Sequence, residues 1–165
     1  MTSKNRIFLA SSDLLSSCRE RSLKVSVAES CTGGLICAAL TDLPGSSSMF
    51  DRGFITYTNK SKTDMLGVPS NFFSQFGAVS EEVACSMAEG AILQSNADLA
   101  VSVTGIAGPD GGVKGKPVGL VFFSIAQKNI VTHTFKHIFD GSRSNIRMSA
   151  SIKAIEILLH ASKKC

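Results

Sequence analysis

The chain has 165 residues, of which 44% are hydrophobic and 18% are charged, and its formal net charge is +4. This length predicts one domain over residues 1–165, and the composition excludes a disordered or fibrous chain. The positive charge is small and its Lys and Arg residues are scattered, so we expect no nucleic-acid partner.

The first third of the chain predicts a helix, a short strand and a second helix. A loose apolar stripe indicates a helix over about residues 7–21, and an apolar run indicates a strand over residues 25–28. A tight turn at residues 33–34 follows. The apolar segment 35–40 does not alternate, which is typical of a buried helix that ends before Pro44.

The middle of the chain predicts a second strand and two more helical segments. The segment 53–57 is a strand candidate, and the polar residues 58–64 open a short helix in a unit that Pro69 closes. Ser80 precedes two glutamates, and its hydroxyl can cap free N–H groups at the start of a helix. We expect this helix to continue to about Leu93.

The last part of the chain predicts three strands and a final helix. A strand over residues 99–103 runs into a glycine-rich loop, and the segments 120–125 and 130–139 indicate an antiparallel hairpin. An amphipathic helix begins at Ser142. Strands that alternate with helices, followed by a hairpin, predict an α/β fold: a three-layer α/β/α sandwich with a mixed, mostly parallel sheet.

Cysteine usage and hydropathy indicate where the protein works. The five cysteines form no C-x-x-C pair and have no histidine at zinc spacing, so we expect a reducing compartment and no metal site. No apolar run approaches the roughly 20 residues that span a bilayer, and the start has no signal-peptide pattern. We therefore expect a cytoplasmic protein with no membrane partner.

The segment 28–34 is the first candidate for chemistry, because a strand ends there and a helix begins. N–H groups at such a helix start can hold an anion or a developing oxyanion. Ser30 stands where a nucleophile could stand, although its hydroxyl or that of Thr32 could instead cap the helix. Cys31 is a competing nucleophile, since a thiol near a helix start can have a lowered pKa. It has no evident base, and we interpret it as a packing residue.

Two further segments also follow predicted strands. A lysine beside a serine can act as a general base when its pKa falls toward neutrality, and the segment 57–62 offers both Lys60 and Lys62. These residues alone do not decide between the two lysines. The glycine-rich segment 104–112 has no Walker ending, but its N–H groups could line a phosphate or ribose pocket. We expect all three segments to form one pocket.

Five motifs in chain order resemble the CinA C-terminal-domain family, in a standalone form. They are Ala28-Glu29-Ser30-Cys31-Thr32-Gly33-Gly34, Tyr57-x-Asn59-x-x-Lys62, Gly77-Ala78-Val79-Ser80-Glu81, Thr104-Gly105-Ile106-Ala107-Gly108-Pro109-Asp110-Gly111-Gly112 and Lys116-Pro117-Val118-Gly119. The resemblance implies hydrolysis of the carboxamide of nicotinamide mononucleotide to nicotinate mononucleotide and ammonia, in pyridine-nucleotide salvage. It implies no cofactor, a small pyridine nucleotide as the partner, and a homo-oligomer.

The resemblance also implies roles for individual residues. It makes Ser30 the nucleophile of an acyl-enzyme mechanism and Lys62 its base, and Tyr57 could position Lys62 or relay a proton. Substrate-binding or oxyanion-binding positions are expected at Thr32, Gly33, Gly34, Asn59, Thr104, Gly105, Ala107, Gly108, Arg143 and Arg147. The alternative is a pyridine-nucleotide-binding or regulatory domain without turnover.

The chain departs from the family pattern in two respects. Ser142 stands where the family usually has Asp before the last helix, and any contact that needs a carboxylate there is in doubt. Both residues cap helices, so the fold should tolerate the change. Many members also carry a large N-terminal domain, and roles tied to that domain do not transfer to this sequence.

Overall fold

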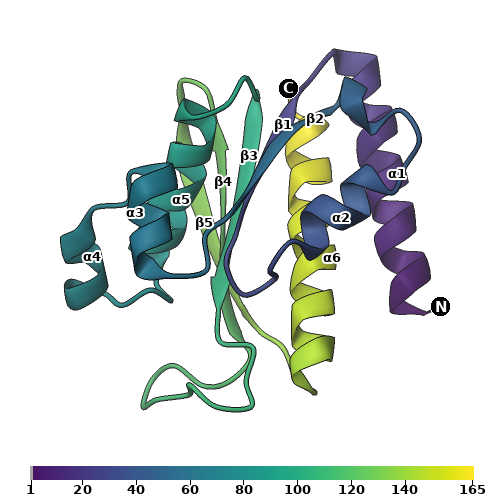
Figure 1. Cartoon of the computed structure of the whole chain (residues 1–165). Coiled ribbons are helices and arrows are strands. Elements are labelled where there is room, and N and C mark those ends of the chain that lie inside the picture. Colours follow the sequence, from purple (N-terminus) through teal and green to yellow (C-terminus); the bar gives the residue numbers. More distant parts are fainter. Residues whose placement is uncertain (1) are drawn as a thin grey trace.

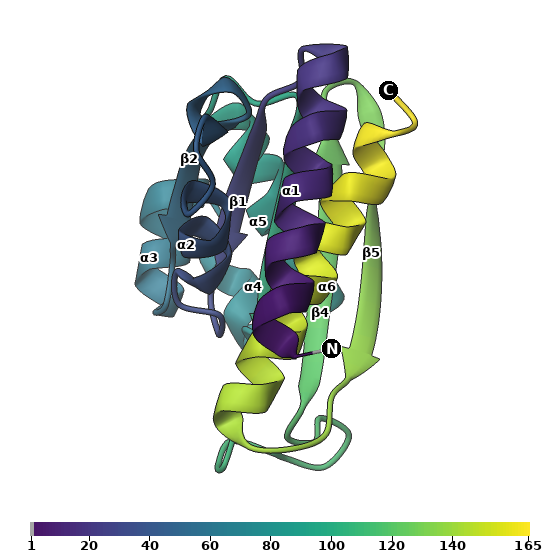
Figure 2. The same ribbon diagram turned by 90° about the vertical axis from the view of Figure 1, so that its right-hand side faces the viewer.

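The computed structural model describes residues 2–165 and places one mixed sheet between two layers of helices (Figures 1 and 2). The strands are β1 (Val25–Glu29), β2 (Phe50–Ile55), β3 (Leu99–Gly105), β4 (Leu120–Gln127) and β5 (Ile130–Ile138). Their order in the sheet is β2-β1-β3-β4-β5. β1 pairs in parallel with β2 and β3, whereas β4 is antiparallel to β3 and β5. The predicted α/β fold is confirmed.

Helices cover both faces of the sheet. They are α1 (Ser3–Arg21), α2 (Leu35–Thr41), α3 (Asn59–Leu66), α4 (Ser70–Gln75), α5 (Glu81–Leu93) and α6 (Arg143–Ser162), with a short 3-10 helix η1 (Ser46–Ser48). Figure 1 shows α1, α2 and α6 on one side of the sheet and α3, α4 and α5 on the other. α5 and α6 contact β3 and β4 from opposite faces, and α1 packs against α6. Within residues 2–165, no helix is both long enough and apolar enough to cross a bilayer.

The centre of the sheet is buried on both faces. Every residue of β1 is buried, and β3 is buried as far as Thr104. Parallel strands that are covered by helices on both sides are nearly continuous apolar runs, as these two are. A larger apolar cluster that includes Ile36 and Phe123 lies on the α6 side, and a smaller one that includes Val83 and Met87 lies under α5.

The second strand lies earlier in the chain than the sequence predicts. β2 pairs with β1 along its whole length, so the strand expected over residues 53–57 is displaced toward the N-terminus. The Thr56 N–H still donates to the Glu29 carbonyl at 2.8 Å, but Tyr57 has left the sheet and its side chain is 60% exposed. Tyr57 therefore belongs to the loop that enters α3.

Two helices differ from the sequence prediction. α1 begins earlier than expected because the Thr2 hydroxyl accepts a hydrogen bond from the Asn5 N–H and caps it. α4 was not predicted, and it starts directly after Pro69, which occupies its N-cap position. A proline is tolerated at a helix start, where its missing N–H leaves no unmade bond. Phe72 and Phe73 attach α4 to the apolar cluster under α5.

The carboxyl ends of β1, β2 and β3 lie side by side at one edge of the sheet. Glu29, the last residue of β1, is in register with Ile55 of β2 and Val103 of β3. The loops that follow these three strands therefore meet at this edge. Ligands of open α/β sheets bind beyond the carboxyl ends of the strands.

Candidate active site

A cavity of about 190 Å³ lies at this edge of the sheet. It is lined by Ser30, Cys31, Tyr57, Lys62, Ala78, Val79, Thr104, Gly105, Ala107 and Arg143. These residues come from the three segments that the sequence predicts to form one pocket, together with the loop before α5 and the start of α6.

Ser30 and Lys62 meet inside this cavity. Ser30 follows β1, and its N–H donates to the Val103 carbonyl at 3.0 Å, which holds it beside β3. Lys62, from α3, has its Nζ 2.9 Å from Ser30 Oγ and 2.7 Å from the Thr56 carbonyl oxygen. Both side chains are buried, and Lys62 is only 1% exposed. A hydroxyl and an amine are thus in direct contact.

Burial also changes the protonation of Lys62. An ammonium group loses favourable hydration when it is buried, and this lowers the pKa of Lys62 to about 8. At pH 7 about a tenth of such lysines are neutral, against under a thousandth of exposed ones. Lys62 can therefore accept a proton near neutral pH, which a base requires.

The structure brings Lys62 and not Lys60 to Ser30. Lys60 is exposed and forms an ion pair with Asp64 one turn further along α3. Side chains two positions apart on a helix point to different sides, so only one of the two lysines can face the cavity. The capping box formed by Thr58 and Ser61 fixes where α3 begins, and hence which lysine that is.

Ser30 does not cap α2, because another side chain does. The Glu29 carboxylate accepts hydrogen bonds from the N–H groups of Gly34 (2.8 Å), Ile36 (3.3 Å) and Cys37 (2.9 Å). Sequence reasoning assigned Glu29 no role. The signal was present, since an acid a few residues before a helix start is favoured by the helix dipole.

The turn after Ser30 uses some of the N–H groups that were expected to hold an oxyanion. The Gly33 N–H donates to the Ser30 carbonyl at 3.1 Å, and the Gly34 N–H is taken by Glu29. Within residues 2–165, no protein acceptor is found for the N–H groups of Cys31 and Thr32. These two donors remain free for a ligand.

The environment of Cys31 disfavours thiolate chemistry. The side chain is 6% exposed and packs in the large apolar cluster, although it also borders the cavity. Burial raises the pKa of its thiol to about 11, so the lowering that a nearby helix start could produce does not occur. The thiol stays protonated at neutral pH, in keeping with its interpretation as a packing residue.

Tyr57 and Arg143 form the mouth of the cavity. Arg143 Nη2 donates to the Tyr57 hydroxyl at 3.0 Å, and Nη1 donates to the Gly108 carbonyl at 2.7 Å. The first turn of α6 is thereby linked to the glycine-rich loop and to the loop before α3. The Tyr57 hydroxyl contacts Arg143 and has no hydrogen bond to Lys62 among the described residues.

The other residues expected to bind substrate fall into two groups. Thr104, Gly105 and Ala107 line the cavity, and the Thr104 hydroxyl also donates to the Ala78 carbonyl at 2.8 Å. The remaining positions do not line the cavity; they are Thr32, Gly33, Gly34, Asn59, Gly108 and Arg147. Arg147 instead donates from Nε to the Cys31 carbonyl (3.1 Å) and from Nη2 to the Thr32 carbonyl (2.9 Å).

Lys116 supports one wall of the cavity, a role that sequence reasoning missed. Its ammonium donates to the carbonyls of Phe76 (2.6 Å) and Val79 (2.8 Å). The segment that follows the glycine-rich loop 104–112 is thereby tied to the loop before α5, whose Ala78 and Val79 line the cavity. A lysine within a family motif could have been singled out, but its acceptors are backbone atoms that only the fold identifies.

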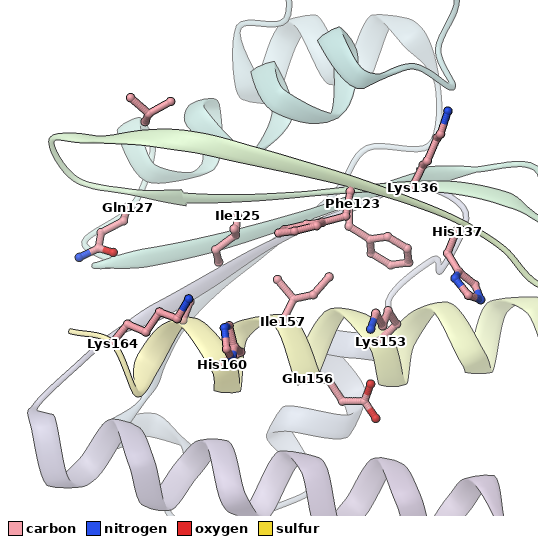
Figure 3. A pocket seen from close by; sticks show the side chains of 13 residues that line it. Phe123, Ile125, Gln127, Lys136, His137, Lys153, Glu156, Ile157, His160 and Lys164 are labelled. Atoms are coloured by element: carbon pink, nitrogen blue, oxygen red, sulfur yellow. The ribbon is translucent and has the colours of Figure 1, made fainter.

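A larger cavity lies away from Ser30, between β4, β5 and α6, with a volume of about 590 Å³ (Figure 3). Phe123, Ile125 and Ile157 form its apolar interior, and His137 and His160 also line it. Its lining within the described residues contains no Ser, Thr or Cys. It therefore offers no hydroxyl or thiol nucleophile, and the smaller cavity is the candidate active site. Residues 2–165 hold no group of three or more His, Cys, Asp or Glu suited to a metal ion.

Comparisons with known proteins identify the family that the chain resembles. The CinA C-terminal domain family matches residues 9–162. The chain is 54% identical over 139 residues to a putative competence-damage inducible protein of Caldicellulosiruptor saccharolyticus, covering 84% of this chain and 34% of that protein. It is 45% identical over 157 residues to the nicotinamide-nucleotide amidohydrolase PncC of Enterobacter agglomerans, covering 95% of this chain and 96% of that one.

A solved structure has the same fold. The competence/damage inducible protein CihA from Agrobacterium tumefaciens superposes with a TM-score of 0.91 at 45% identity, and the match covers 94% of both chains. The chain thus spans about a third of the Caldicellulosiruptor relative, at 34%, but nearly all of the Enterobacter protein, at 96%.

Proposed function

The chain belongs to the CinA C-terminal domain family, and on that premise we propose that it hydrolyses the carboxamide of nicotinamide mononucleotide to nicotinate mononucleotide and ammonia. The observation that carries the proposal is the 2.9 Å contact between Lys62 Nζ and Ser30 Oγ at the cavity. The name of the Enterobacter relative supports the reaction. A buried amine beside a hydroxyl is the arrangement that Ser-Lys hydrolases use.

The reaction proceeds in two halves. Neutral Lys62 accepts the hydroxyl proton of Ser30 while Oγ attacks the carboxamide carbon, and the carbonyl electrons move onto oxygen. Lys62 then gives the proton to the amide nitrogen, the C–N bond breaks, and ammonia leaves an ester on Ser30. In the second half, Lys62 takes a proton from a water molecule while the water oxygen attacks the ester carbon. The bond from that carbon to Ser30 Oγ then breaks, and Lys62 returns the proton to Oγ. Ser30, Lys62 and water carry every proton.

The turn that carries Ser30, called here the nucleophile turn (residues 30–34), offers two backbone donors for the oxyanion. The N–H groups of Gly33 and Gly34 already have acceptors, so we assign the role to the N–H groups of Cys31 and Thr32. Backbone donors that are fixed before the reaction stabilise the developing charge without reorganising. One such donor is worth about 10²–10³ in kcat.

The size of the cavity suggests how the nucleotide lies. A volume of about 190 Å³ suits the pyridine carboxamide better than a whole nucleotide. The ribose and the 5′-phosphate then lie at the mouth, beside Arg143 and the glycine-rich loop 104–112. A guanidinium and free loop N–H groups both suit a phosphate dianion.

Ammonia release by the purified chain tests this function. We expect release from nicotinamide mononucleotide and none from the Ser30→Ala variant. Nicotinamide riboside lacks the phosphate, and its kcat/KM should be lower by at least about tenfold, since a charge-assisted hydrogen bond contributes about 1.5–3 kcal/mol. Absence of ammonia from the nucleotide would contradict the proposal, and equal kcat/KM for both substrates would remove the phosphate site from it. The lowered pKa of Lys62 beside the Ser30 hydroxyl favours turnover over the alternative of a domain that only binds or regulates.

We further propose that the protein works in the cytoplasm as a homo-oligomer. All five cysteines are free, which supports a reducing compartment. The edge strand β5 exposes Ile130, Val131, Phe135 and Ile138, and exposed apolar edges are sites of strand pairing. An antiparallel pairing of two copies centred on Thr134 brings Ile130 opposite Ile138. Light scattering should then give a multiple of the chain mass, and Phe135→Lys should lower it; a monomer in the unmodified protein would contradict this.

A further inference from the structure

The turn that carries Ser30 has a backbone that is not rigid by itself. Gly33 and Gly34 adopt left-handed conformations, with φ of 58° and 94°. Glycine reaches such angles without strain but restricts the chain least of all residues. The hydroxyl of Ser30 must nevertheless stay within hydrogen-bond distance of Lys62, so other groups have to hold the turn.

Glu29 holds the N–H side of this turn. Its carboxylate is fully buried, and its two oxygens accept the backbone N–H groups of Gly34, Ile36 and Cys37. No Lys, Arg or His forms an ion pair with it among residues 2–165. The charge is balanced by N–H groups and by the positive end of α2. It takes no part in the proton transfers of the proposed reaction.

Arg147 holds the carbonyl side of the same turn. Its guanidinium donates to the successive carbonyls of Cys31 and Thr32, at 3.1 and 2.9 Å. A planar guanidinium with fixed donors suits two neighbouring acceptors, whereas an ammonium offers only a point charge. A Cβ built on Gly33 would lie 3.2 Å from Arg147 Nη2, so the guanidinium lies directly against the turn.

We infer that Glu29 and Arg147 are positioning residues that fix the nucleophile turn from its two polar sides. The inference rests on the proposed function, because it concerns the orientation of Ser30 for attack. A trans peptide is planar, so its C=O and N–H point in opposite directions. Arg147, by holding the Cys31 carbonyl, also fixes the direction of the Thr32 N–H, which has no protein acceptor in the described residues. One residue thus orients both the nucleophile and an oxyanion donor.

Arg143 provides a matched comparison on the same helix. It lies one turn before Arg147, lines the cavity, and contacts Tyr57 and Gly108 at its mouth. The family resemblance implies a substrate-binding role for both arginines. Their contacts separate the two roles: Arg143 faces the place of the substrate, and Arg147 faces the backbone that presents Ser30.

Steady-state kinetics with two matched variants tests the inference. Arg147→Lys should lower kcat by about 10- to 100-fold and leave KM within about twofold, because a displacement of about 1 Å can cost about a hundredfold. Arg143→Lys should chiefly raise KM. Glu29→Gln places an NH₂ group opposite backbone N–H groups and should also lower kcat. Thermal unfolding will show whether each variant folds. If Glu29→Gln does not fold, the kinetics of Arg147→Lys test the positioning role.

A second measurement separates this inference from the proposed reaction. A fluorophosphonate reacts with an activated serine and needs no pyridine nucleotide, so its rate of Ser30 modification reports on Ser30 and its base independently of the substrate. That rate should fall by a similar factor in Arg147→Lys and keep its rise through about pH 8, since Lys62 is untouched. A wild-type chain that is labelled but releases no ammonia would contradict the proposed substrate only. Unchanged kcat and labelling in Arg147→Lys, or a raised KM alone, would overturn the positioning role.

Discussion

At the scale of single residues, the adjacent candidate nucleophiles Ser30 and Cys31 differ in what surrounds them. Ser30 Oγ lies against Lys62 Nζ, whereas burial raises the pKa of the Cys31 thiol to about 11. We therefore expect Ser30→Ala to abolish turnover while nucleotide affinity, measured by calorimetry, stays close to wild type. The nucleophile contributes to the transition state and little to ground-state binding.

Cys31→Ala is the matched control for this change. It removes the neighbouring nucleophile, and we expect it to retain most of kcat. A Cys31→Ala enzyme that folds normally and releases no ammonia would point to thiol catalysis instead. Near-normal turnover in Ser30→Ala would exclude the serine.

The pH dependence of the rate should report Lys62. Burial lowers its pKa to about 8, so kcat/KM should rise with pH along a limb centred near that value. Lys62→Arg keeps the charge but cannot lose its proton in the working range, so it should be inactive. Lys60→Arg should stay active, since Lys60 is exposed and paired with Asp64. Activity in the first variant and none in the second would make Lys60 the base.

The sequence alone singles out these residues but cannot assign their contacts. Ser30 and the two lysines were visible as residue types at strand ends, and the choice of Lys62 depended on a family spacing. The hydrogen bonds of Arg147 to the Ser30 turn join residues 115 and 116 positions apart, and their acceptors are carbonyls. No residue type marks a backbone acceptor, so a contact of this kind could not be predicted.

At the scale of elements, α6 depends on its cap. Ser142 occupies the N-cap, and its hydroxyl accepts a hydrogen bond from the Asn145 N–H. Ser142→Ala should cost about 1 kcal/mol, or about 2–4 °C in Tm, in thermal unfolding. Ser142→Asp should avoid this loss, because a carboxylate caps equally well and favours the positive helix end. A loss of stability in Ser142→Asp as large as in Ser142→Ala would contradict this account.

Element types were predicted better than element bounds. The hydrophobic pattern alone indicated the five strands. β1 and β3 are buried on both faces and are therefore apolar runs, and a polar turn separates β5 from β4. The bounds of β2 depend on its register with β1, which no local pattern contains. α4 was missed because it has only six residues and no polar cap, and its phenylalanines are explained only by the cluster that they join.

At the scale of the whole molecule, the sheet order assembles the site. Three segments at strand ends predict one pocket only if their strands are neighbours, and the order β2-β1-β3 makes them so. That order could not be derived from the sequence, because it depends on which strands pair across the core. Ser30, Lys62 and the glycine-rich loop therefore become one site through packing of the whole chain.

The same packing makes the buried Lys62 costly to the stability of the folded protein. Lys62 is only 1% exposed, and burial lowers its pKa from 10.5 to about 8. Between these values the unfolded chain binds a proton that the folded chain does not, so the free energy of unfolding rises with pH. Below pH 8 both states are protonated, and the native state bears the full cost of the buried charge.

Lys62→Met measures this cost. Relative to this variant, the wild-type free energy of unfolding should increase by about 3 kcal/mol from pH 7 to pH 10.5, since each unit of pKa shift corresponds to about 1.4 kcal/mol. Denaturant unfolding at several pH values gives the difference, in which titrations shared by both proteins cancel. Lys60→Met is the control, and because that side chain is exposed its difference should stay constant. A constant difference for Lys62→Met as well would mean that Lys62 keeps an ordinary pKa in the folded protein, and the pH limb expected for catalysis would then lose its physical cause.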